Sequence, residues 1–228
     1  MNMGEEVSHL KAHVNTFYNN GALQRASEQP HLKTNQKPSQ INKKVGSQVN
    51  VIGSGIGALP EQVSYEAEAQ IIASNAHARA AAAEAAEDAG LSVLANEEAL
   101  HDDYQAVATA IGKKLRQMGS GVMVFGGEPT VVLPPNPGQG GRNQALALAL
   151  AHEISGLEDI TVVVGGTDGT DGPTNAAGGV VSGATWAKGA DEALAAADSG
   201  AFLENAGALL VTGPTGTNVM DLIVAIRD

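Results

Sequence analysis

The chain has 228 residues, a formal net charge of −12 and no cysteine. This length suits one large or two small domains, and 43% hydrophobic residues are normal for a protein with a buried core. The lack of cysteine excludes disulfides, thiolate metal sites and thiol nucleophiles, and the acidic balance argues against nonspecific nucleic-acid binding. No segment resembles a signal peptide or approaches the ~18 apolar residues of a membrane span, so we expect a cytoplasmic protein without a membrane partner.

The composition changes near Val51. Residues 1–50 contain six Lys or Arg and three acids, whereas residues 51–228 contain seven and twenty-two. The first segment is also rich in Asn and Gln and has one short apolar period. We therefore expect residues 1–50 to be a disordered or unrelated tail with no more than one helix.

Regular patterns begin near Glu66 and alternate between strand and helix. Short apolar runs predict strands, an Ala-rich stretch that ends at Gly90 predicts a helix, and a longer amphipathic stretch predicts a second helix. In chain order these are strand 69–75, helix 76–89, strand 91–95 and helix 97–118. We interpret residues 51–120 as a region built around one strand-helix unit.

The second half of the chain continues the alternation. Two strands are expected at 121–128 and 129–134, the second stopped by prolines, and the β-branched run 159–166 predicts a buried strand. The other expected elements are helix 142–154, loop 167–179, helix 190–199, a turn at 202–207, strand 208–213 and strand 221–228. This pattern indicates an α/β fold with a mixed sheet.

The first motif is Gly138-Gln139-Gly140-Gly141 followed by Arg142. Glycines let the backbone approach a ligand, and the free N–H groups at a helix start favour an anion. A cation at a helix start is unfavourable by ~0.3–1 kcal/mol. Two-point binding of a carboxylate by Arg142 would offset this cost. Alternatively, Arg142 only pairs with Glu128 or with an aspartate of the next loop.

The second motif places Thr167, Asp168 and Asp171 after the buried strand 159–166. Two carboxylates three residues apart can hold Mg²⁺ or polarise a hydroxyl. Asp-Gly pairs also form ordinary turns, so spacing leaves both interpretations open.

The third motif, residues 212–218, offers hydroxyls and glycine N–H groups for an oxyanion but lacks the lysine of a P-loop. A fourth, Gly53 to Ala58, fits the short form of a dinucleotide fingerprint. Pro60 follows it closely, and Asn75 stands where an acid for the ribose is expected. An NAD(P)H-linked reductase is therefore a weaker alternative.

Four segments in this order, GGEPTVVLP, PGQGGRNQALALALA, VVGGTDGTDGPTNAAGGVV and LLVTGPTGTNVMDL, resemble the MOFRL domain of class II glycerate kinases, some of which are named hydroxypyruvate reductases. The resemblance covers residues 121–228. It implies a mixed-sheet MOFRL domain preceded, at 51–120, by a remnant of a Rossmann-like glycerate kinase domain.

The resemblance implies a kinase that uses ATP and Mg²⁺ to phosphorylate D-glycerate at its 2-hydroxyl. Arg142, Asp168 and Asp171 then match catalytic positions, with the two aspartates as metal ligands. The expected substrate-binding residues are Glu128, Gly138, Gly140, Gly141, Asn143, Thr167, Thr215, Thr217 and Asn218.

Two departures from the family pattern bear on activity. Gln139 and Ala145 stand where the family has an arginine and a glutamate, and most of the nucleotide-binding domain, including a lysine-bearing helix, has no counterpart in the chain. Three alternatives therefore stay open. They are a truncated kinase that is inactive alone, a noncatalytic MOFRL binding module, and an NAD(P)H-linked hydroxypyruvate reductase. Apolar surface left without the absent domain would favour a homodimer or larger assembly.

Overall fold

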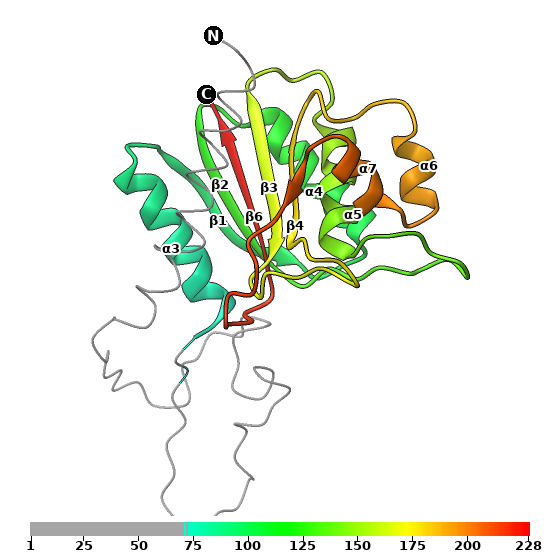
Figure 1. Ribbon diagram of the computed structural model, residues 1–228. Coiled ribbons are helices and arrows are strands. Elements are labelled where there is room, and N and C mark those ends of the chain that lie inside the picture. The colour runs from blue at the N-terminus through cyan, green and yellow to red at the C-terminus, as the bar shows by residue number, and fades with distance from the viewer. Residues whose placement is uncertain (1–70, 72) are drawn as a thin grey trace, which may run out of the picture.

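The computed structural model describes residue 71 and residues 73–228 (Figure 1). A six-stranded sheet forms the centre, in the order β1-β2-β6-β3-β4-β5. β1 and β2 are parallel, and each of the other neighbouring pairs is antiparallel. The predicted α/β fold with a mixed sheet is confirmed.

The first half of the described chain contains two helices and two strands. They are α3 (Asn75–Asp88), β1 (Val93–Leu100), α4 (Tyr104–Gln117) and β2 (Gly121–Gly127). The prediction of a helix from residue 97 is wrong at its start, because β1 continues to Leu100 and pairs with β2 as far as Gly127. The expected strand 69–75 lies partly outside the described residues, and Asn75 belongs to α3.

The second half contains three helices and four strands. They are α5 (Arg142–Glu153), β3 (Ile160–Gly166), β4 (Gly178–Ser182), α6 (Ala190–Ala195), α7 (Ser199–Asn205), β5 (Leu209–Leu210) and β6 (Asp221–Arg227). The expected strand 129–134 is wrong. Only Thr130 forms a bridge, to Asp103, since the following prolines cannot donate to a ladder.

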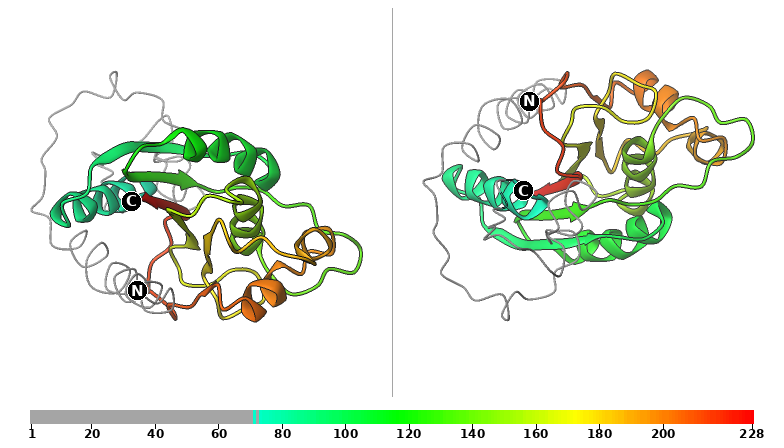
Figure 2. Two further views of the ribbon diagram at one scale, coloured as in Figure 1. Left: turned by 90° about the horizontal axis from the view of Figure 1, so that it is seen from above. Right: turned by 90° about the horizontal axis from the view of Figure 1, so that it is seen from below.

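Helices cover both faces of the sheet. Val122 and Val124 of β2 face α3 and pack against its buried residues Ala82 and Ala86. Phe125, on the opposite face, joins the larger core with α4 and α5, as the alternation of side chains along a strand requires. Figure 2 shows α6 and α7 at the end of the molecule opposite α3.

None of the helices in the described part is long and apolar enough to cross a membrane. β1 forms one edge of the sheet and pairs only with β2 among the described strands. The predicted tail at residues 1–50 lies outside the described residues.

Candidate functional site

The expected site residues gather at one edge of the sheet. β2 and β3 both run antiparallel to β6, so Gly127 and Gly166 lie beside Asp221, the first residue of β6. The loops after β2 and β3 and the loop before β6 therefore meet at this edge, as the lower part of Figure 1 shows. We call it the site edge.

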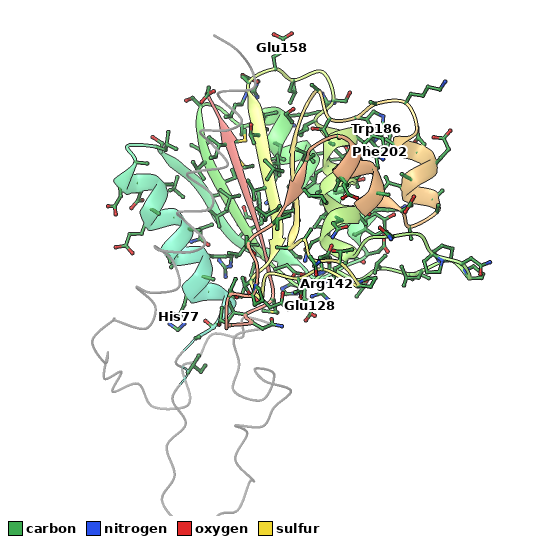
Figure 3. All side chains as sticks on the ribbon, in the orientation of Figure 1. His77, Glu128, Arg142, Glu158, Trp186 and Phe202 are labelled. Carbon is green, nitrogen blue, oxygen red and sulfur yellow. The ribbon has the colours of Figure 1, made fainter. Side chains whose placement is uncertain are left out.

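Arg142 is the first residue of α5 and connects two acids. Its Nε donates to Oδ2 of Asp221 at 2.8 Å, and its Nη2 donates to Oδ1 of Asp221 at 3.4 Å. Its Nη1 lies 3.0 Å from Oε1 of Glu128, and Figure 3 shows these two side chains together at the site edge. The Arg142 side chain is 34% exposed and that of Glu128 is 53% exposed, so the Glu128 contact is the more accessible one.

Asp221 is the site residue that sequence reasoning missed. Its side chain is 3% exposed, and burial raises its pKa even though Arg142 and Asn143 donate hydrogen bonds to it. Burial also opposes the charge of Arg142, but the hydrogen bond and attraction from Asp221, with the charge of Glu128, raise the pKa of the guanidinium. Arg142 therefore stays charged and is oriented by a buried carboxylate.

Asp171 caps α5. Its Oδ1 accepts from the backbone N–H of Asn143 at 3.1 Å, and its Oδ2 accepts from that of Gln144 at 2.8 Å. Burial raises the pKa of Asp171 to about 6, while these two hydrogen bonds oppose the shift. The helix start thus binds an anion, as the pattern suggests, but that anion is a side chain of this protein.

Asn143 faces the interior of the site edge. It is 1% exposed, and its Nδ2 donates to Oδ1 of Asp221 at 3.0 Å. Within the described part of the chain, its Oδ1 has no hydrogen-bond partner. The contact with Asp221 makes Asn143 a support for the Arg142–Asp221 pair.

Asp168 is partly exposed and joins two loops. Its Oδ1 accepts from the N–H of Thr170 at 3.0 Å, and its Oδ2 accepts from Nδ2 of Asn218 at 3.3 Å. Its carbonyl oxygen accepts from the N–H of Thr215 at 3.2 Å. Of the two aspartates of this loop, Asp168 is the one that faces solvent.

Two of the three expected threonines, Thr167 and Thr215, donate their hydroxyls to backbone carbonyls. The hydroxyl of Thr167 donates to the carbonyl of Met220, and Thr167 is 2% exposed. The hydroxyl of Thr215 donates to the carbonyls of Thr167 and Thr217. These contacts fix the loop before β6 against the end of β3.

The glycines before α5 allow close packing. The N–H of Gly138 donates to the carbonyl of Ala196. A Cβ at Gly140 would lie 2.9 Å from the backbone nitrogen of Gly200, and one at Gly141 would lie 2.3 Å from Oδ1 of Asp171. The Gly-rich segment is therefore shaped in part by contacts within the protein.

The described residues contain no group of three or more His, Asp or Glu that could hold a metal ion. Asp171 directs both carboxylate oxygens at α5, which leaves Asp168 as the accessible carboxylate of the predicted pair. The predicted dinucleotide segment, Gly53 to Ala58, lies outside the described residues.

Comparison with known proteins shows what this part of the chain is similar to. The MOFRL family matches residues 121–221. D-glycerate 2-kinase of Thermotoga maritima is 52% identical over 110 residues, which are 46% of this chain and 26% of that protein. Human glycerate kinase is 41% identical over 154 residues, which are 62% of this chain and 29% of that protein.

A solved structure shows the same relationship in three dimensions. The crystal structure of glycerate kinase from Thermotoga maritima matches with a TM-score of 0.67 and 35% identity, over 71% of this chain and 42% of that one. The matched part of the chain thus spans from about a quarter to less than half of the length of these relatives. Residues 121–221 therefore match the MOFRL family, and the chain is similar in sequence and fold to part of these glycerate kinases.

Proposed function

We propose that the site edge is the carboxylate-binding side of a D-glycerate 2-kinase site. The observation that carries this proposal is the partly exposed Arg142. The buried carboxylate of Asp221 orients its guanidinium, and the exposed carboxylate of Glu128 contacts it on its solvent-facing side. A guanidinium has five N–H donors and matches a carboxylate in two places. The carboxylate of glycerate would take the place of Glu128 on the exposed side of Arg142.

The proposed reaction transfers the γ-phosphoryl group of ATP to the 2-hydroxyl oxygen of D-glycerate. The new bond joins that oxygen to phosphorus, the bond between the γ-phosphorus and the β–γ bridging oxygen breaks, and ADP leaves. Asp168 is the accessible carboxylate near Arg142's edge of the sheet, and it would accept the proton of the hydroxyl. Asn218, which donates to Asp168, would orient it.

The proposed reaction uses ATP and Mg²⁺. The described residues offer a carboxylate for the metal ion but little positive charge for the triphosphate. The three loops of the site edge, residues 128–141, 167–177 and 211–220, contain no Lys or Arg, and neither does the loop after β1, residues 101–103. Arg142 alone cannot neutralise a triphosphate. When bound, Mg²⁺ would supply the missing positive charge. Mg²⁺ commonly takes one or two carboxylates plus phosphate oxygens, and Asp168 would serve either as that ligand or as the proton acceptor, since coordination to the metal weakens a carboxylate as a base.

A noncatalytic binding module is the second candidate. The lack of Lys and Arg in the described loops of the site edge favours it, since these loops alone cannot neutralise a triphosphate. Such a module would bind glycerate through Arg142 without turnover.

Release of ADP from ATP in a coupled assay separates the candidates. The kinase predicts ADP release that depends on D-glycerate, and Arg142→Ala should lower kcat/KM by roughly 2–4 kcal/mol. Lys188→Ala, which removes an exposed positive charge distant from the site edge in sequence, serves as the control. Glycerate binding without ADP release would indicate the module, and unchanged activity of Arg142→Ala would remove Arg142 from the mechanism.

A further inference from the structure

The residue before Asp221 has a strained backbone. Met220 has φ +68, a left-handed conformation that residues with a Cβ rarely adopt. Such a residue costs on the order of 1–3 kcal/mol and persists only where the surrounding contacts impose it. This turn directs the chain into β6, so it determines where Asp221 enters the site edge.

Thr167 contacts this turn from the end of β3. Its N–H and its hydroxyl donate to the carbonyl of Met220, at 3.0 and 2.7 Å. The same hydroxyl accepts from the N–H of Val219 at 2.8 Å. Thr167 therefore binds both the N–H of Val219 and the carbonyl of Met220. Its hydroxyl has no remaining proton to donate to a ligand.

Asn75 contacts the turn from α3, on the other side. Its Nδ2 donates to the carbonyl of Val219 at 2.9 Å and to that of Asp221 at 3.1 Å. Its Oδ1 accepts from Nε of Arg79 at 3.0 Å, so all the polar hydrogens and the oxygen of this amide are engaged. Asn75 is 1% exposed, which makes these hydrogen bonds costly to lose.

Asn75 is itself held in place. Arg79 also donates to Asn96 and to Glu98 of β1, so its guanidinium is fixed. A Cβ on Gly126 would lie 2.0 Å from Oδ1 of Asn75, so the amide packs directly against the bare backbone of β2. A buried, fully bonded side chain in this position can transmit the placement of α3 to Asp221.

We propose that Asn75 and Thr167 are positioning residues, which hold the Met220 turn and thereby fix the Asp221 carboxylate against Arg142. Neither residue touches the exposed side of Arg142. The catalytic role of these two residues rests on the proposed function, because they act by orienting the Arg142 guanidinium, which is proposed to bind glycerate. It also gives the region before residue 121 a part in the site of the MOFRL domain.

The side-chain Nε–H of Arg142 reports this geometry directly, because it donates to Asp221. We would measure its ¹⁵N resonance and its hydrogen exchange in the full chain at pH 7, with Arg142→Lys to assign the signal. Asn75→Ala and Thr167→Val should each shift the resonance and speed exchange about tenfold. Thr167→Ser keeps the hydroxyl and should restore the original rate.

Asn205→Ala is the matched control, because Asn205 is an exposed residue at the end of α7, which lies at the end of the molecule opposite α3. It should leave the Arg142 signal unchanged. If Asn75→Ala does not fold, Asn75→Asp replaces it, since it keeps the acceptor for Arg79 and removes the two donors. Unchanged exchange in the folded Asn75 and Thr167 variants would overturn the inference. The measurement needs no turnover, so loss of the kinase proposal would leave its result intact.

Discussion

At the scale of single residues, the site depends on one cation and the acids around it. The sequence indicated Arg142 because a basic side chain at a helix start is unusual. It did not indicate Asp221, which begins an apolar strand 79 positions later in the chain. The sequence does contain a signal for this pair: an acid at the start of a buried strand needs a partner, and residues 120–228 contain only three Lys or Arg, namely Arg142, Lys188 and Arg227.

Removing Arg142 should destabilise the fold as well as the site. Arg142→Ala leaves the Asp221 carboxylate buried without its cation, and we expect a loss of about 2–3 kcal/mol in the free energy of unfolding. Urea unfolding measures this loss. Asp221→Asn in the Arg142→Ala background should recover part of it, and strictly additive losses would contradict the pairing.

Asp171 should make stability depend on pH. Its pKa rises from 3.8 to about 6 on folding, so the folded state binds the proton more tightly than the unfolded state. The resulting stabilisation is complete below pH 3.8 and is lost as the pH rises through about 6. The shift corresponds to about 3 kcal/mol.

Asp171→Asn removes this titration but keeps an acceptor for α5. Urea unfolding of both proteins between pH 4 and 7 should show the stability of the original chain, relative to the variant, falling as the pH rises. Asp191→Asn, which removes an exposed charge of α6, is the control. A constant difference between the original chain and Asp171→Asn across this range would disprove the assignment.

At the scale of elements, α5 and the Gly-rich segment before it form the frame of the site. Long periodic segments such as α5, β3 and β6 were predictable because their apolar patterns are continuous. β4 begins with two glycines inside an expected loop, and β5 has only two residues, so local pattern identified neither as it stands in the fold. β4 pairs with β3, and β5 pairs with β4, so tertiary contacts set both pairings.

The close fit of Gly141 against Asp171 can be tested by one methyl group. In Gly141→Ala the added Cβ would lie 2.3 Å from Oδ1 of Asp171, which must move away from the N–H groups of α5. We expect a loss of about 1–3 kcal/mol in stability by thermal or urea unfolding. Gly119→Ala is the control, because a Cβ there has no neighbour within 4 Å. Equal effects of the two substitutions would refute the fit.

At the scale of the whole molecule, the described sheet has two edge strands, the eight-residue β1 and the two-residue β5, so β1 is the longer edge. Leu94 of β1 is 43% exposed, and β1 has a strand partner on one side only among the described strands. Such an edge favours pairing with another chain.

We therefore expect self-association, seen by light scattering as a mass above that of one chain. Leu94→Lys should shift the mass toward the monomer, because a charge on an edge strand opposes pairing. Glu192→Lys, on exposed α6, should leave the mass as it is. A monomeric original chain would contradict the expectation.

Binding of D-glycerate at the site edge can be tested through Arg142, the only Lys or Arg among the described residues of its loops and of the first turn of α5. D-glycerate should be titrated into the ¹⁵N-labelled chain while the Nε–H resonance of Arg142 is followed, with glycerol, which lacks the carboxylate, as the matched ligand. We expect a saturable shift with D-glycerate, none with glycerol, and the loss of D-glycerate binding in Arg142→Lys. An Arg142 resonance that does not respond to D-glycerate, with or without Mg²⁺ and ATP, would contradict it.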